Sequence, residues 1–405
     1  MTEHIFLADK PISENNKMDS IFLVLVLLLW GLGLYTQFIC TQEKAISLHF
    51  SSKYYFFYRQ LIFSALGLFV FALVSLVPMK FIRKSVFITS LICLVLCFIT
   101  IFLGDKHKGA TRWLSFGGFS FQPSEFAKFF LVLYLSHLFV KHSKEYELNN
   151  KECLFPLLVL FAFALTIFAQ KDFSTGVFIL IVGIAMFVIC GANILYLTPF
   201  LVFVIPATVL LVASEDYRLN RVLAFFHPED FESTYAYQVI KSQNAIKAGG
   251  FWGTGMGTGM NLVPSIPEVQ TDYIFAGFAN SMGLLGVTVY IFILILFAWR
   301  GFKISFNCPN KFASYASFGL VFTIVLQSLT NIAVVSGAAP TTGIPLPFFS
   351  AGGSSLISTF LMCGFILNAS HCKADDEDSE YKNEFNTYNA EEVFESFNGV
   401  RVEYE

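Results

Sequence analysis

Residues 85–103 read SVFITSLICLVLCFITIFL, a run of nineteen residues without a charged side chain. An α-helix of this length can cross the hydrocarbon core of a bilayer. The whole chain is 55% hydrophobic and 14% charged, with a mean hydropathy of +0.64, which is too apolar for a water-soluble domain of this length. Similar runs recur, so we predict an all-α polytopic membrane protein with about ten transmembrane helices. The runs lie near 19–40, 55–77, 85–103, 122–140, 153–170, 175–191, 193–213, 271–299, 312–338 and 350–370.

The orientation follows from the cations in the short loops between these runs. They are Lys80, Arg83, Lys84, Lys141, Lys144, Lys151, Arg300, Lys303 and Lys311. Short loops rich in Lys and Arg stay in the cytoplasm, so both termini are predicted to be cytoplasmic. The segments 104–121, 214–270 and 339–349 then face outward. We expect a membrane domain over residues 1–370, with a cytoplasmic extension at 1–18.

Residues 371–405 form a separate acidic tail with eleven acids and three bases. This composition predicts a disordered cytoplasmic segment, which is either a solubilising terminus or an interaction tail. The acidic charge argues against nucleic acid as a partner. The eight cysteines are scattered, mostly in apolar runs, and neither they nor the histidines have the spacing of a metal site. No metal ligand is predicted.

Residues 109–128, GATRWLSFGGFSFQPSEFAK, are more polar than a simple connector needs to be. Glu125 and Lys128 lie three residues apart, so they share one face of the helix that Pro123 begins. One interpretation is a structural ion pair at the membrane edge. The other is a cationic site in which Arg112 and Lys128 bind phosphate oxygens and Glu125 orients the lysine.

Two further outward segments are polar. The turn 170–176, QKDFSTG, could be a simple connection in which Ser174 or Thr175 caps the next helix. The long segment 214–270 contains an amphipathic stretch at 237–247, predicted to form a helix on the membrane surface. Its glycine-rich run at 249–259 resembles a nucleotide loop, but no preceding strand is evident, so we expect close backbone approach to a bulky ligand instead.

Asp272 stands at the edge of an apolar run, in the stretch PSIPEVQTDYIFA at 264–276. A carboxylate at this depth is costly unless it pairs with a cation, lines a cavity or performs chemistry. The alternative is capping, with Thr271 as the N-cap and Asp272 in the first turn. The last outward segment, GIPLPFFSAGGSS at 343–355, combines rigid prolines with glycines that let the chain re-enter the bilayer.

These motifs together resemble the SEDS family, the shape, elongation, division and sporulation proteins of bacteria. The resemblance covers about residues 19–370. Its motifs are the Gly-Ala-x-Arg-Trp and Gln-Pro-Ser-Glu segment, the Gln-x-Asp turn, the Thr-Asp-Tyr-Ile-Phe-Ala segment and the Pro-rich segment ending in Gly-Gly-Ser-Ser. The N-terminal arrangement is closer to the division (FtsW-like) members than to the elongation (RodA-like) members. The sequence departs from the family pattern at Lys171, Gln270, Ala351 and Asn280-Ser281, and none of these changes removes Asp272.

The resemblance implies a peptidoglycan glycosyltransferase that polymerises lipid II at the outer face of the cytoplasmic (inner) membrane, in septal synthesis. Asp272 would be the general base. The expected substrate- and pyrophosphate-binding residues are Arg112, Trp113, Gln122, Glu125, Lys128, Ser354 and Ser355. A divalent cation, Mg²⁺ or Mn²⁺, could assist the leaving group. The implied partners are a class B penicillin-binding transpeptidase and other division proteins of the membrane. Two alternatives stay open, a lipid II flippase and an elongation-type polymerase.

Overall fold

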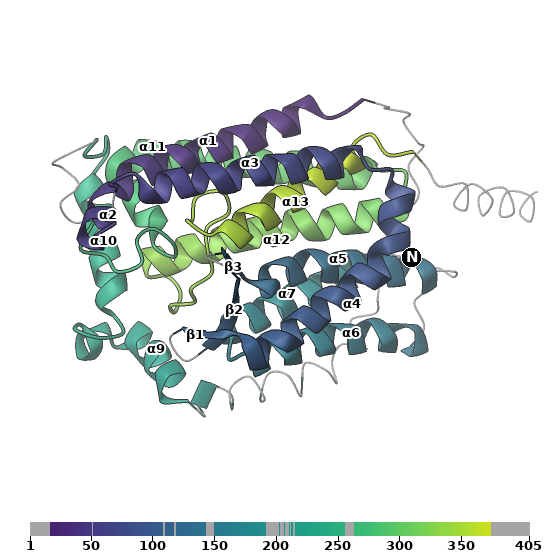
Figure 1. Cartoon of the computed structure of the whole chain (residues 1–405), viewed down its shortest axis with the longest axis horizontal. Coiled ribbons are helices and arrows are strands. Elements are labelled where there is room, and N and C mark those ends of the chain that lie inside the picture. The colour runs from purple at the N-terminus through teal and green to yellow at the C-terminus, as the bar shows by residue number, and fades with distance from the viewer. Residues whose placement is uncertain are drawn as a thin grey trace, which may run out of the picture.

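The structure, a computed structural model, describes residues 17–50, 52–107, 110–116, 119–142, 150–191, 215–255 and 263–373, with residues 202, 206, 210, 212 and 213. Long helices lie side by side along one axis and form a bundle (Figure 1). They are α1 (Ser20–Cys40), α3 (Tyr55–Leu76), α4 (Met79–Leu103), α5 (Pro123–His142), α6 (Asn150–Ala169), α7 (Phe173–Ile189), α11 (Ile274–Asn307), α12 (Lys311–Ser336) and α13 (Gly353–Ala369). Most of the predicted span 193–213, and the tail from residue 374, lie outside the described residues.

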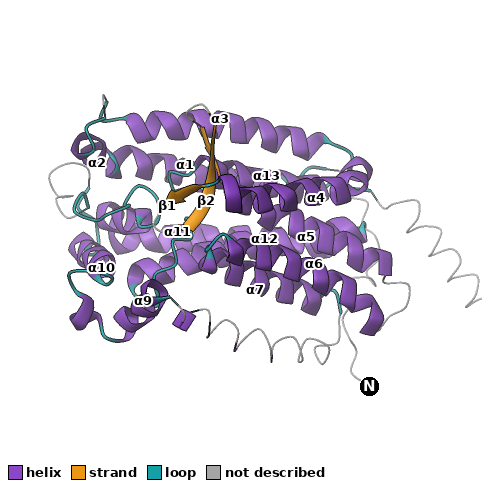
Figure 2. Ribbon diagram, turned by 60° about the horizontal axis from the view of Figure 1, so that its bottom comes forward, coloured by secondary structure: helices purple, strands orange, loops and turns teal. Residues whose placement is uncertain are grey.

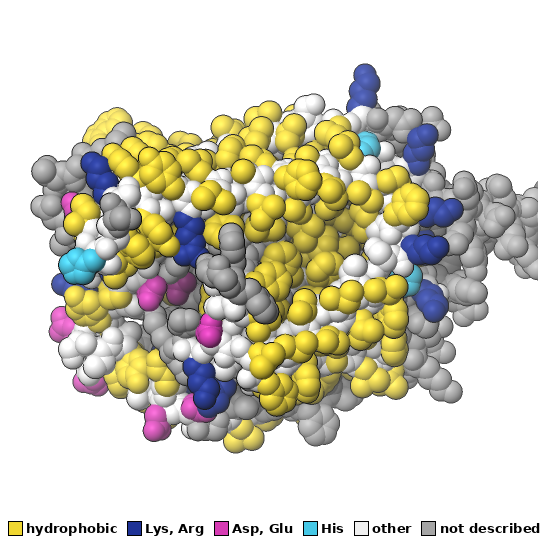
Figure 3. Space-filling model, viewed as in Figure 1, with side chains coloured by type: hydrophobic (Ala, Val, Ile, Leu, Met, Phe, Trp, Pro, Cys, Tyr) yellow, Lys and Arg dark blue, Asp and Glu magenta, His cyan; other side chains and the backbone are white. Residues whose placement is uncertain are grey.

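The flanks of the bundle are apolar. Five described helices, α1, α3, α4, α11 and α12, are long and apolar enough to cross a membrane, and α6, α7 and α13 contain shorter apolar stretches. Many large apolar side chains on these helices are exposed, and Figure 3 shows them as a broad hydrophobic band on the visible face. Such a surface is stable in lipid and not in water. The chain is therefore a multi-pass membrane protein, as predicted.

Helix α13 lies inside the bundle. It packs against α3, α12 and α5, and nearly all of its residues are buried. Gly364 allows this packing, because a Cβ there would lie 2.7 Å from the backbone oxygen of Phe71 on α3. Because α13 is surrounded by other helices, the chain enters the bundle between them where α13 begins. The segment before α13 therefore lies next to the ends of those helices.

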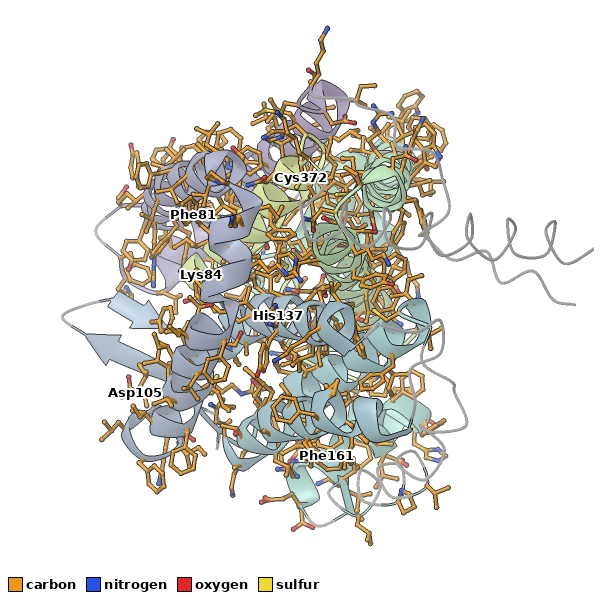
Figure 4. All side chains as sticks on the ribbon, turned by 90° about the vertical axis from the view of Figure 1, so that its right-hand side faces the viewer. Phe81, Lys84, Asp105, His137, Phe161 and Cys372 are labelled. Carbon is orange, nitrogen blue, oxygen red and sulfur yellow. The ribbon has the colours of Figure 1, made fainter. Side chains whose placement is uncertain are left out.

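Helix α4 begins earlier than the apolar run indicates. It starts at Met79, directly after Pro78, and its first turns carry Lys80, Arg83 and Lys84. Long basic side chains can reach the membrane surface from inside a helix, so charge does not end the helix there. Phe81 and Lys84, labelled in Figure 4, lie in these turns, and Asp105 lies where the chain leaves the far end of α4.

A small sheet, which the sequence pattern did not predict, follows α4. Strands β1 (Asp105–His107), β2 (Ala110–Phe116) and β3 (Phe119–Phe121) pair antiparallel in the order β1-β2-β3. The sheet contacts α4, α5 and α13 (Figure 2). Strands β1 and β3 have three residues each and are too short to give a periodic signal, so much of the segment resembles a loop in the sequence.

The segment between α7 and α11 contains the short α9 (Asp216–Phe226), the 3₁₀ turn η2 (Pro228–Phe231) and α10 (Tyr237–Gly249). The helix predicted at 237–247 is confirmed by α10. It packs along α11 and α12, where Ser242, Ala245 and Gly249 are buried. A further short helix, α2 (Gln42–Ser47), follows α1 and lies at the end of the bundle that carries α10 (Figure 1).

Helix α11 is broken at Gly283, which has φ +64° and ψ −168°. The glycine-rich segment after α10 satisfies the backbone groups on both sides of the break. The amides of Leu284 and Leu285 donate to the carbonyls of Gly250 and Phe251, and two amides of that segment donate back to α11. These glycines therefore allow close approach to a broken membrane helix, where the sequence analysis expected a ligand.

Candidate functional site

The polar segments singled out in the sequence meet at one end of the bundle. Gln122 precedes α5, Asp172 precedes α7, Asp272 precedes α11 and Ser354 lies in the first turn of α13. Because the helices alternate in direction, these positions share the end that carries α2, α9, α10 and the sheet (Figure 1). We call this the polar end and the opposite one the basic end.

Asp272 lies in a tight turn just before α11. Its amide and those of Thr271 and Tyr273 donate to the carbonyl of Glu268, which has a φ of +55°. The N-cap position is Tyr273, without a side-chain cap hydrogen bond, so the alternative in which Thr271 caps α11 is wrong. The Thr271 hydroxyl instead donates to Glu268. The Asp272 carboxylate is half-buried, and a Cβ added at Gly343 would lie 3.4 Å from its Oδ2.

The turn is fastened to the segment that leads into α13, residues 343–352. The Ser350 hydroxyl donates to the Thr271 carbonyl at 2.6 Å and accepts the Leu346 amide at 2.7 Å. The Ala351 amide donates to the Gln270 carbonyl at 2.8 Å. Hydrogen bonds between a re-entrant segment and a neighbouring turn satisfy backbone groups that lipid cannot satisfy. The turn and the segment therefore form one rigid unit.

Four amide side chains from the surrounding helices hold this unit. Gln37 on α1 donates to the carbonyls of Gln270 and Phe349, and Gln60 on α3 donates to those of Phe348 and Ser350. From α12, Gln327 donates to the Pro345 carbonyl and Asn331 to the carbonyls of Asp272 and Ile344. All four side chains are buried. Buried amides with backbone partners fix the conformation of irregular chain inside a membrane protein.

The Glu125–Lys128 pair lies deeper in the bundle. The Lys128 ammonium is 2.8 Å from Glu125 Oε2 and donates to Gln327 Oε1 at 2.9 Å, and both charged side chains are almost fully buried. The ammonium also lies 5.6 Å from the centre of the Phe178 ring. The predicted ion pair is thus present, and Gln327 connects it to the re-entrant segment. Lys128 is engaged by protein groups, so any effect on an anion is electrostatic through a low-dielectric interior.

Arg112 belongs to a second ion pair. It lies on β2, with its Nε 3.4 Å from Oδ2 of Asp172, whose carboxylate is fully buried while Arg112 stays 28% exposed. The other oxygen of Asp172 accepts the Thr175 amide, so Asp172 is the cap of α7, in place of the predicted Ser174 or Thr175. The guanidinium is thereby held by a buried acid while part of it remains accessible from outside.

The remaining predicted residues connect the sheet to α13. The backbone amide of Gln122 donates to the Ser354 hydroxyl at 3.0 Å, and the side-chain amide of Gln122 donates to the Ser124 hydroxyl. Ser355 is buried in the first turn of α13, where its carbonyl accepts the Thr359 hydroxyl. Trp113 is half-buried on β2. Gln122 and Ser354 therefore meet directly and Ser355 follows Ser354 on α13, whereas Trp113 lies on β2 opposite Asp105 of β1.

The sequence motifs do not include the four amides, and they include Asp172 only as part of the Gln-x-Asp turn, without a role for its side chain. A signal existed for the pair on α12, because Gln327 and Asn331 lie four residues apart within an apolar run and so share a helix face. Buried amides in a membrane helix need partners, which marks such a pair as structural or functional.

Among the residues that the structure describes, no three His, Cys, Asp or Glu side chains cluster as metal ligands do. The acids of the turn before α11 are Glu268 and Asp272. Magnesium is commonly held by one or two carboxylates together with substrate phosphates, and the two acids of this turn suit such a shared site.

The fold and the site define a polytopic membrane protein with a rigid acidic turn and two ion pairs at one end of its bundle. A family model described as "Cell cycle protein", covering FtsW, RodA and SpoVE, matches residues 19–375. The chain belongs to this family, as the sequence motifs indicated.

Individual relatives agree with this assignment. The chain is 33% identical over 357 residues to a probable peptidoglycan glycosyltransferase FtsW of Borreliella burgdorferi, a match covering 88% of this chain and 98% of the relative. It is 30% identical over 368 residues to the stage V sporulation protein E of Bacillus subtilis, with the same coverage, 88% and 98%.

Solved structures share the fold. A chain of a peptidoglycan synthase complex superposes with a TM-score of 0.71 at 23% identity, covering 87% of this chain and 97% of that one. The rod shape determining protein RodA of Thermus thermophilus gives a TM-score of 0.63 at 22% identity, covering 87% and 96%.

Proposed function

We propose that this protein is a peptidoglycan glycosyltransferase that polymerises lipid II, with Asp272 as the general base. The observation that carries the proposal is the half-buried Asp272 carboxylate, held on a rigid turn at the polar end within a family whose relatives are named peptidoglycan glycosyltransferases. A base must be held in place to act, and the hydrogen bonds around this turn supply that rigidity.

In this reaction the 4-hydroxyl of the acceptor sugar attacks the anomeric carbon of the donor. The new glycosidic bond forms as the bond to the polyprenyl pyrophosphate breaks. Asp272 takes the hydroxyl proton, and the pyrophosphate leaves with the bonding electron pair. One base on the attacking side suffices for an inverting transfer.

Two cations would stabilise the leaving group as its charge develops. Arg112 is partly accessible and forked, and so suits direct contact with phosphate oxygens. Lys128 would act without direct contact, because the positive potential of its buried ammonium would stabilise the negative charge that develops on the pyrophosphate. Trp113, Gln122, Glu125, Ser354 and Ser355 would shape the surroundings of the pyrophosphate. A Mg²⁺ or Mn²⁺ ion would supply further charge neutralisation there.

The flippase alternative fits the charge distribution less well. Translocation of a charged headgroup favours polar groups along the full depth of the membrane. Among the described residues, the ion pairs Glu125–Lys128 and Arg112–Asp172 lie toward the polar end, and the pair Asp19–Arg300 lies at the basic end. This distribution supports chemistry at one surface.

We also infer that the polar end faces outward, where the sugar of lipid II is exposed, and that both termini are cytoplasmic. Figure 3 supports this orientation, since Lys and Arg without visible acids gather at one end of the hydrophobic band. The FtsW-named relatives support a role at the division septum. The synthase complex among the structural neighbours supports a class B penicillin-binding transpeptidase as partner, together with other membrane proteins of division.

Asp272→Asn tests the proposal, because the amide keeps the size of the side chain but cannot take a proton. We expect the purified full-length variant to fold and bind lipid II in detergent, with polymerisation reduced on the order of 10²–10⁴-fold. Asp216→Asn, which changes an exposed acid at the same end, is the matched control and should retain activity. Detergent also separates polymerisation from flipping. Normal glycan chains from folded Asp272→Asn protein would overturn the assignment.

A further inference from the structure

Asn331 on α12 makes a double contact at the proposed base. Its Nδ2 donates to the carbonyl of Asp272 and to the carbonyl of Ile344, both at 2.8 Å. An amide nitrogen carries two hydrogens, so both bonds form at the same time. The side chain is 1% exposed, so water does not compete for these carbonyls.

The two carbonyls belong to different segments. Asp272 lies in the turn before α11, whereas Ile344 lies near the start of the segment that leads to α13, next to Gly343, which stands beside the Asp272 carboxylate. Asn331 therefore fixes the distance between Asp272 and the segment 343–352 that lies beside its carboxylate. Without the amide, two buried carbonyls would lose their partner, and the turn would shift to recover one.

The face of α12 that carries Asn331 also contacts Lys128. Gln327 lies one turn before Asn331 on α12, accepts a hydrogen bond from Lys128 and donates to Pro345, the residue after Ile344. A rigid helix thus holds the acid, the re-entrant segment and the ion pair in a fixed mutual arrangement.

We propose that Asn331 is the positioning residue for Asp272, acting with Gln327 as a pair of amides that aligns the base with the cationic side of the site. This inference rests on the proposed function, because it assigns Asn331 a role through the base. Misplacing a reacting group by about 1 Å can cost on the order of 10²-fold in rate, so loss of the clamp should appear in kcat. Lipid II binding depends on other groups and should change little.

The chain offers a matched control in Asn368 on α13. Its Nδ2 also donates to two backbone carbonyls, those of Val74 and Val77, at 2.7 and 2.6 Å, and it is also buried. These partners lie at the C-terminal end of α3, at the basic end of the bundle. The two asparagines make the same bonds at opposite ends, so they separate a general loss of stability from a loss of alignment.

The experiment compares Asn331→Leu and Asn368→Leu in the full-length protein, with lipid II in detergent. Both variants should unfold at lower temperature. Only Asn331→Leu should lose kcat on the order of 10²-fold, with KM for lipid II within about threefold of wild type. Asn331→Ser, which keeps a donor for one carbonyl, should lose on the order of tenfold and decides the matter if Asn331→Leu does not fold. Equal kcat losses for both Leu variants, or wild-type kcat in Asn331→Ser, would overturn the inference.

Asp272→Asn, assayed in the same preparation, separates the two possible failures. If that variant polymerises lipid II normally, the assignment of the base has failed. If it is inert while Asn331→Leu matches the Asn368→Leu control, the base stands and only the positioning role of Asn331 has failed.

Discussion

The buried pair of Glu125 and Lys128 can be tested for structure and for chemistry at the same time. At 2.8 Å, an effective dielectric constant of about 20 gives an attraction of about 6 kcal/mol, against which stands the cost of removing both ions from water. Breaking such a pair by changing one partner costs about 3–5 kcal/mol, because the other charge stays buried alone. Replacing both partners with neutral residues of similar size avoids that cost.

We therefore expect Glu125→Gln and Lys128→Met each to lower the apparent free energy of unfolding by about 3–5 kcal/mol. The double variant should be more stable than either single variant. Thermal unfolding in detergent measures this, and gel analysis of glycan chains from lipid II measures activity. If Lys128 stabilises the leaving group, the well-folded double variant should still make almost no glycan.

The exposed pair Lys171–Glu215, at 3.1 Å, serves as the control. Its side chains are 57% and 45% exposed, so Lys171→Met should cost only about 0–1 kcal/mol. A Lys128→Met variant as stable as this control would refute the reasoning about the buried pair. Wild-type polymerisation by the double variant would show that Lys128 has no part in the reaction.

Three further predictions follow from the site. Arg112→Ala should reduce polymerisation strongly, and Arg112→Lys should recover only part of it because the forked donor is lost; equal activity of the two variants would argue against phosphate contact. Gly343→Ala should lower both stability and kcat, because residue 343 has φ +78°, which strains an alanine and would shift the backbone beside Asp272 Oδ2; unchanged kcat would mean that the carboxylate keeps its place despite the strain. Ser233→Cys, exposed at the polar end, should react with an impermeant thiol reagent in intact spheroplasts, whereas Lys80→Cys at the basic end should react only after lysis; the reverse pattern would invert the topology.

The sequence by itself determined the membrane bundle and the location of its polar segments. Apolar length is a local property, so the runs at 19–40, 55–77 and 312–338 correspond closely to α1, α3 and α12. Alternation of helix direction then placed the motifs containing Gln122, Asp272 and Ser354 at one end. The Glu125–Lys128 contact was also predictable, because residues three apart share a helix face.

Only the tertiary structure decided which groups meet across the bundle. The partners of Asn331 are 59 and 13 residues away, and Lys128 meets Gln327 across 199 residues, so no periodicity reports them. The sequence likewise could not show that the glycines after α10 support the break at Gly283. Hydrophobic patterning fixes which residues enter the membrane, but the identity of a buried amide's partner depends on how the helices pack, and that packing holds Asp272 in place.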